Sequence, residues 1–153
     1  MLGVDPGVFQ VADKFFSNPI AVQKRKTKSK KSAAKKPTIL VVDDQPMVAD
    51  TTVEILNRFG FRAVHAYNAQ TALRIAAKLK PDYLLADVLM PGMNGVELAI
   101  AITRMLPATK ILLFSGQAGI ADILRQGRQE GYVFDLIAKP VHPEKLIEHL
   151  KRK

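Results

Sequence analysis

The chain has 153 residues, of which 48% are hydrophobic and 24% charged, and it contains no cysteine. That length suits one domain with a short extension, the composition is that of a globular protein, and the lack of cysteine excludes a disulfide framework and a thiolate metal site. No apolar run reaches the ~18 residues that span a bilayer, and the first residues do not form a secretory signal, so we expect no membrane partner and a cytoplasmic location.

Positive charge is concentrated near the start of the chain. The formal net charge is +9, and residues 1–37 hold nine Lys/Arg against two Asp, which leaves the remainder close to neutral. The segment QKRKTKSKKSAAKKP over 23–37 has almost no large apolar side chain to bury, so we expect a flexible basic extension over 1–37. Within it, VFQVADKFF over 8–16 has the period of an amphipathic helix, although one too short to be stable alone.

From Thr38 onward, short apolar runs alternate with segments of helical period. The predicted strands are 38–42, 62–67, 83–87, 110–114 and 133–138, and the predicted helices are 46–58, 69–79, 95–105, 119–130 and 143–152. Pro46 suits the first position of a helix, and Asn68 suits a helix cap. Five strand-helix repeats with nearly continuous apolar strands predict an α/β domain over 38–153, with a doubly wound five-stranded parallel sheet and helices on both faces.

Polar residues interrupt the apolar pattern where the predicted strands end. Asp43 and Asp44 follow the first strand, and the third strand ends in Asp87. Ser115 and Lys139 come directly after the fourth and fifth strands. Because parallel strands end at the same edge of a sheet, about 4.8 Å apart, we expect these five side chains to share one crevice.

Three carboxylates in one crevice require positive charge beside them. Two unit charges ~5 Å apart repel by about 3 kcal/mol at an effective dielectric near 20. Lys139 supplies one cation, and ligands that are all oxygen favour Mg²⁺ over Zn²⁺ as the second. Mg²⁺, an ammonium and a hydroxyl together suit a phosphoryl group, which Asp87 can accept as an acyl phosphate.

Four motifs stand at these strand ends: Asp43-Asp44, Asp87 followed by VLMPGMNG, Ser115-Gly116 and Lys139-Pro140. Together they resemble the receiver domain of response regulators in two-component signalling, including its chemotaxis members. The resemblance covers about 38–153. It implies a flavodoxin-like fold with strand order 2-1-3-4-5, the order of the chemotaxis member of that family.

The resemblance also implies a role for each carboxylate. Asp87 is the phosphoacceptor, and it takes the phosphoryl group from a histidine kinase or a phosphotransfer protein. Asp44 binds Mg²⁺ directly and Asp43 binds it through water. Asp87 and the backbone carbonyl of Leu89 complete the protein ligands of the metal.

The remaining roles fall on the last two strands. Lys139, with a cis bond to Pro140, pairs with Asp87 and then with the phosphoryl oxygens. The Ser115 hydroxyl moves toward the phosphoryl group and triggers the switch. Leu136 departs from the family pattern, because the family commonly has Tyr or Phe three residues before the lysine.

Two consequences follow for the switch and for hydrolysis. Phe134 and Tyr132 are the candidates to replace the missing aromatic ring at Leu136. By family analogy, Leu89 and Gln117 flank the path of the water that hydrolyses the phosphoryl group. Neither side chain is acidic. We therefore predict a phosphoryl lifetime longer than seconds.

The function expected from this pattern is that of a stand-alone response regulator, since the sequence closes with the last predicted helix. It is expected to be a phosphoacceptor rather than a turnover enzyme, with output through an unknown downstream protein. One alternative is a nucleic-acid-binding protein that acts through the basic N-terminal arm, with the receiver as its regulator. Another is a small phosphatase or nucleotide-binding domain, which the lack of a glycine-rich phosphate loop after the first strand disfavours.

Overall fold

The computed structural model describes residues 34–116 and 119–152. The chain divides into two units, Met1–Lys35 and Lys36–Lys153, and the described residues lie almost entirely in the second. The predicted amphipathic segment over 8–16 lies outside the described residues, as does most of the predicted extension over 1–37.

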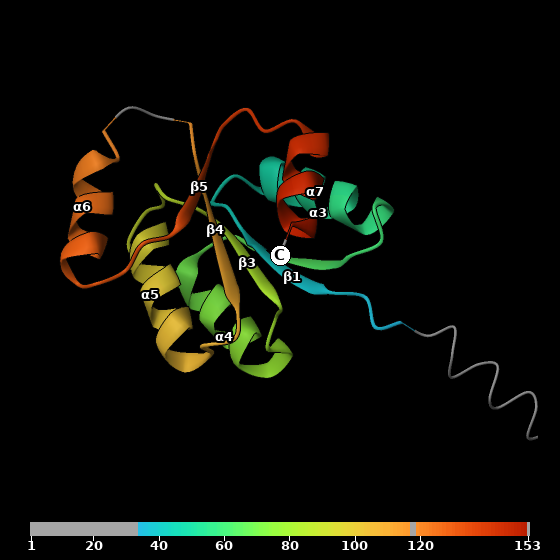
Figure 1. Ribbon diagram of the computed structural model, residues 1–153, viewed down its shortest axis with the longest axis horizontal. Helices are drawn as coiled ribbons and strands as arrows, with labels where there is room; N and C mark the ends of the chain where they lie inside the picture. The colour runs from blue at the N-terminus through green and yellow to red at the C-terminus, as the bar shows by residue number, and fades with distance from the viewer. Residues whose placement is uncertain (1–33, 117–118, 153) are drawn as a thin grey trace, which may run out of the picture. The chain divides into compact units, whose positions relative to one another are not determined.

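The second unit is a parallel sheet with helices on both faces (Figure 1). Its strands run in the order β2-β1-β3-β4-β5, which confirms the predicted doubly wound topology. The strands are β1 (Thr38–Val42), β2 (Arg62–Ala66), β3 (Tyr83–Asp87), β4 (Lys110–Ser115) and β5 (Asp135–Ala138). The helices are α3 (Pro46–Arg58), α4 (Ala69–Leu79), α5 (Gly95–Met105), α6 (Ala121–Gln129) and α7 (Pro143–Lys151).

Alternate residues of the central strands belong to two separate apolar clusters, one on each face of the sheet. Leu40 and Leu84 face α4, α5 and α6, whereas Ile39 and Leu85 face α3 and α7. All five residues of β1 are buried, as expected for a strand covered on both faces. Polar groups are therefore confined to the ends of these strands.

The helices begin at capping signals of the expected kinds. Pro46 occupies the first turn of α3, and the Asn68 side chain accepts a 2.8 Å hydrogen bond from the Thr71 N–H at the start of α4. Asn94 and Glu97 form a capping box that fixes the start of α5. No helix within the described ranges has the length and apolarity needed to cross a membrane.

The structure corrects several predicted boundaries, most clearly around α6. Gly119 has φ +96°, so α6 begins only at Ala121, not at residue 119. At its other end the Tyr132 N–H donates to the Gly127 carbonyl at 2.9 Å, and Gly131 has φ +91°. This turn delays β5 to Asp135, two residues after the predicted start. The ends of β2, β4 and α7 each differ from prediction by one residue.

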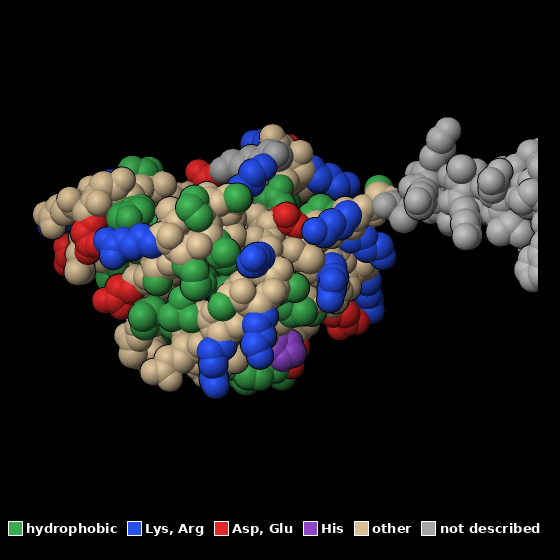
Figure 2. All heavy atoms as spheres, turned by 90° about the horizontal axis from the view of Figure 1, so that it is seen from below, with side chains coloured by type: hydrophobic (Ala, Val, Ile, Leu, Met, Phe, Trp, Pro, Cys, Tyr) green, Lys and Arg blue, Asp and Glu red, His purple; other side chains and the backbone are tan. Residues whose placement is uncertain are grey.

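Positive side chains gather where the strands begin. Arg62 and Lys110 start β2 and β4, Lys80 follows α4, and Lys151 ends α7, all of them exposed. Figure 2, which views the molecule of Figure 1 from below, shows Lys and Arg side chains spread over this face. The carboxylates predicted to form the site follow the opposite ends of the strands.

Candidate functional site

Three carboxylates meet at the carboxyl edge of the sheet. Because Val42 of β1 lies opposite Ala86 of β3, the residues that follow them are neighbours. One oxygen from each of Asp43, Asp44 and Asp87 lies within 4.8 Å of the others. Asp43 is only 2% exposed, so its charge depends on partners within the protein.

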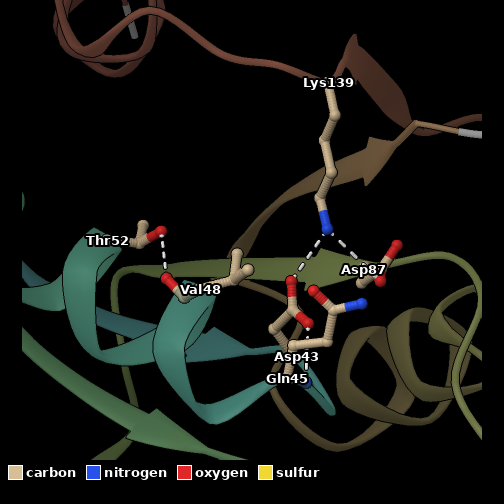
Figure 3. Close-up of polar contacts among 6 residues, drawn as sticks. All are labelled: Asp43, Gln45, Val48, Thr52, Asp87 and Lys139. Carbon is tan, nitrogen blue, oxygen red and sulfur yellow. Dashed lines mark hydrogen bonds and ion pairs between the residues drawn. The ribbon is translucent and has the colours of Figure 1, made fainter.

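Lys139 supplies the counter-charge of this cluster. Its ammonium lies 2.8 Å from Asp43 Oδ2 and 3.3 Å from Asp87 Oδ2 (Figure 3). The contact with Asp87 is the one that the resemblance implied, and the shorter contact with Asp43 is additional. A Cβ atom at Gly116 would lie 3.1 Å from Lys139 Cβ, so the glycine makes room for the lysine side chain.

The two ends of this ion pair have shifted pKa values. Burial raises the pKa of Asp87 above its usual range, the Lys139 ammonium opposes that rise, and the charge of Asp43 adds to it. Burial alone would lower the pKa of Lys139. The hydrogen bond and charge of Asp43, with the charge of Asp87, outweigh burial and raise the pKa of Lys139. The lysine therefore remains a cation at neutral pH.

Ser115 and the backbone around Lys139 complete the edge. Ser115 is the last residue of β4 and 7% exposed, and its carbonyl accepts a 2.8 Å hydrogen bond from the Lys139 N–H. The Lys139–Pro140 peptide bond is cis, as the resemblance implied. Leu89 gives a backbone hydrogen bond to Asp87, while its carbonyl as a metal ligand stays a prediction.

The loop after Asp87 folds tightly back on the strand end. The Val88 N–H donates to the Phe114 carbonyl at 2.9 Å, and the Gly95 N–H donates to the Val88 carbonyl at 2.8 Å. A Cβ atom on Gly95 would overlap the backbone carbonyl oxygen of Asp87. Only glycine fits at this point, which explains its place in the MPGMNG stretch.

The position of the missing aromatic ring lies on β5. Leu136 is 43% exposed there. Tyr132 and Phe134 stack on each other with ring centroids 6.0 Å apart, and both pack against the cluster beneath α5 and α6. The Tyr132 hydroxyl also accepts a hydrogen bond from Arg104. Their role as substitutes in the switch stays a prediction.

The donor set of the cluster fits a hard divalent cation. Asp43, Asp44 and Asp87 offer carboxylate oxygen alone, and no histidine belongs to the group. Such ligands are those of Mg²⁺ or Ca²⁺ rather than Zn²⁺. A cation there would also offset the repulsion that the single charge of Lys139 leaves uncompensated.

An apolar cavity of about 550 Å³ lies beside the cluster, between α3 and α7. Val48 and Met47 line it from α3, Leu146 lines it from α7, and the stem of Lys139 forms part of its wall. The sequence pattern did not single out this cavity, because its lining comes from α3, α7 and the ends of β4 and β5, which are far apart along the chain.

Comparisons with known proteins agree with this geometry. A family model described as "Response regulator receiver domain" matches residues 39–151. The chemotaxis protein CheY of Thermotoga maritima is 30% identical over 118 residues, covering 74% of this chain and 94% of that protein. The phosphate regulon transcriptional regulatory protein PhoB of Pseudomonas aeruginosa is 33% identical over 116 residues, covering 74% of this chain and 50% of PhoB. The DNA-binding response regulator MtrA of Mycolicibacterium smegmatis is covered to 48%, so the chain spans about half the length of these two regulators.

Solved structures show the same likeness. A CheY-like response regulator receiver domain from Methanospirillum hungatei superimposes with a TM-score of 0.70 at 27% identity, covering 77% of this chain and 93% of that one. Chemotaxis protein CheY4 of Vibrio cholerae gives a TM-score of 0.68 at 26% identity, covering 77% and 98%.

Proposed function

Because this chain belongs to the family of response regulator receiver domains, we propose that Asp87 accepts a phosphoryl group from a histidine kinase or a phosphotransfer protein. The observation that carries the proposal is the bridging ammonium of Lys139, held between Asp43 and Asp87 beside a third carboxylate. An ammonium in that place lies where the negative charge of a transferring phosphoryl group accumulates.

The transfer is a displacement at phosphorus. A carboxylate oxygen of Asp87 attacks the phosphorus of the donor phosphohistidine, the P–N bond breaks, and the imidazole keeps the electron pair. The Lys139 ammonium follows the phosphoryl oxygens and keeps its contact with Asp43. The Ser115 hydroxyl donates to a phosphoryl oxygen, and its movement starts the conformational signal.

Mg²⁺ belongs to the same proposal. Asp44, Asp87 and the Leu89 carbonyl would hold it directly, and Asp43 would hold it through a water molecule. The ion supplies positive charge to the oxygens of the transferring group. The fit of three clustered carboxylates supports this assignment.

The chain acts in this proposal as a phosphoacceptor and not as a turnover enzyme. Each molecule takes up one phosphoryl group and signals through contact with a downstream protein. CheY of Thermotoga maritima, almost wholly covered by this chain, supports a stand-alone mode, whereas PhoB and MtrA are regulators of about twice the matched length. A cytoplasmic location stays a prediction.

The test is phosphorylation by acetyl phosphate in Mg²⁺, followed by intact mass spectrometry. We expect one added phosphoryl group on the wild-type protein and none on Asp87→Asn. Chelation of Mg²⁺ should suppress the adduct. A protein that stays unmodified, or an adduct that persists in Asp87→Asn, would overturn the assignment of Asp87.

The distribution of positive charge supports a second candidate function, nucleic-acid binding. Residues 23–37 carry eight Lys/Arg and no acid, and Lys/Arg side chains are spread over the face where the strands begin (Figure 2). Binding to a phosphate backbone needs little more than such charge. A duplex affinity that falls steeply with salt and disappears on deletion of residues 23–36 would favour this candidate. Equal affinity in the deletion variant would exclude the arm as its cause.

A further inference from the structure

Gln45 occupies the position before the first turn of α3, yet its side chain does not cap the helix. Its backbone is fixed from both sides. The Gln45 N–H donates to Asp43 Oδ1 at 3.0 Å, and its carbonyl accepts from the N–H groups of Val48 and Ala49 at 3.0 and 3.1 Å. Helix caps favour Ser, Thr, Asp or Asn, whose short side chains reach the first-turn N–H groups. A glutamine side chain is longer than these, and the Gln45 carboxamide is not used to cap α3.

The side chain extends toward the carboxylate cluster. Figure 3 shows the Gln45 carboxamide lying along Asp43, on the side from which Asp87 and the Lys139 ammonium approach. Within residues 34–116 and 119–152, the structure shows no hydrogen bond made by this carboxamide. It is exposed and uncharged, and it carries two N–H donors. Two hydrogen-bond donors thus stand at the rim of a pocket built mainly of acceptors.

We propose that the Gln45 carboxamide donates a hydrogen bond to the phosphoryl group carried by Asp87, and is a phosphoryl-contacting residue of this protein. The inference rests on the proposed function of Asp87. An aspartyl phosphate presents three acceptor oxygens and nearly two negative charges. Lys139 and Ser115 supply two donors, and Gln45 supplies a third from the start of α3.

The charge balance supports a neutral donor at this position. A further cation would compete with Mg²⁺ for the carboxylates, and a further carboxylate would add to their repulsion. A carboxamide does neither, since it is a donor without net charge. Gln45 is therefore expected to strengthen retention of the phosphoryl group while leaving the affinity for Mg²⁺ unchanged.

The experiment measures equilibrium binding of beryllofluoride, a phosphoryl mimic, to the full chain in Mg²⁺ by fluorine NMR. Gln45→Leu keeps the size of the side chain and removes its donors. Gln45→Ser shortens the side chain so that it no longer extends to the phosphoryl group, and it places a good capping residue at the start of α3. Both variants should bind beryllofluoride about tenfold more weakly, the value of one hydrogen bond to a charged group. The midpoint of Mg²⁺ binding without beryllofluoride should not move.

The matched control is Met47→Leu, because Met47 is 82% exposed on the same turn and has no polar group that reaches the phosphoryl site. This variant should bind beryllofluoride as the wild type does. Wild-type affinity in both Gln45 variants would overturn the inference while leaving Asp87 as phosphoacceptor. A wild-type protein that fails to bind beryllofluoride would overturn the proposed function and this inference together. Gln45→Ser also separates the contact from folding, since a gain in thermal stability with a loss of binding cannot come from a damaged helix.

Discussion

Asp87 is a partly buried carboxylate whose ionised form is disfavoured by the fold. Burial and the charge of Asp43 raise its pKa against the opposing effect of Lys139. A raised pKa in the folded state means that folding favours the protonated form. Below the pKa of an unfolded aspartate, about 3.9, the carboxyl is neutral in both states and costs nothing. As the pH rises from that value through the higher pKa of the folded protein, the cost of ionisation grows to its full size.

Asp87→Asn is therefore expected to stabilise the metal-free protein at neutral pH. We expect a rise in Tm on the order of 4 °C, or about 1 kcal/mol for a domain of this size. The difference should vanish near pH 3 and should shrink when Mg²⁺ is added to the wild type. Thermal denaturation in chelator across this pH range measures it. Asp122→Asn is the control, because that side chain is 86% exposed and should change little. A lower Tm for Asp87→Asn at pH 7 would contradict the argument.

Lys139→Met should instead destabilise the folded protein. The substitution keeps an apolar stem against the cavity beside α3 and removes the ammonium that lies 2.8 Å from the buried Asp43. Loss of one partner of a buried ion pair is expected to cost about 2–4 kcal/mol, because the other charge stays buried. Urea denaturation measures this loss. Mg²⁺ should restore part of it, and an unchanged unfolding free energy in chelator would show that Lys139 is not needed as a counter-ion.

At the scale of elements, the sequence was sufficient to predict which segments form strands and helices. Alternation of apolar runs with helical periods predicted all five β-strands and the five α-helices of the second unit. Boundaries failed around α6, where Gly119 and Gly131 turn the chain by backbone conformations that apolar periodicity does not encode. The strand order itself came from family resemblance, since periodicity does not specify which strands are neighbours.

The candidate site was predictable to the same degree. Polar residues at the strand ends identified Asp43, Asp44, Asp87, Ser115 and Lys139. The closer pairing of Lys139 with Asp43 depends on the depth of Asp43, which spacing along the chain does not give. The sequence also did not predict the direction of the Gln45 side chain. A residue at this position usually caps the helix, and the Gln45 side chain makes no cap hydrogen bond.

Two glycines, Gly95 and Gly116, lie where loops meet the site. Substituting one should lower mainly the unfolding free energy, and substituting the other should lower mainly the rate of phosphorylation. Gly95→Ala places a Cβ atom against the Asp87 carbonyl and should cost about 2–3 kcal/mol in unfolding free energy. Gly116→Ala presses only on the Lys139 side chain, at 3.1 Å, and should cost less than about 1 kcal/mol. Phosphorylation by acetyl phosphate should nevertheless slow in Gly116→Ala, because the ammonium is displaced. Equal stability in the two variants would show that the loop at Gly95 can relax.

At the scale of the whole molecule, charge is divided between regions. The carboxylates of the site follow the carboxyl ends of the strands, whereas exposed cations such as Arg62 and Lys110 lie where strands begin. Residues 36–37 lead into β1 at that second edge. In 0.15 M salt the Debye length is about 8 Å, so cations such as Arg62 and Lys110 should have little influence on the carboxylates at the other edge of the sheet.

Removal of residues 1–35 is accordingly expected to leave both the fold and the phosphoryl chemistry intact. The buried apolar residues of the described chain lie within 39–150, inside the unit Lys36–Lys153. The shortened chain also keeps the Pro37 carbonyl, which accepts a 2.9 Å hydrogen bond from the Arg62 N–H at the start of β2. We expect its Tm to stay within about 2 °C of the full chain. The aspartyl phosphate should form to the same extent and decay over times longer than seconds in Mg²⁺, as measured by intact mass against time. A phosphoryl lifetime that changes several-fold on truncation would show that the basic segment acts on the site, and a decay within seconds in both chains would refute the expected lifetime itself.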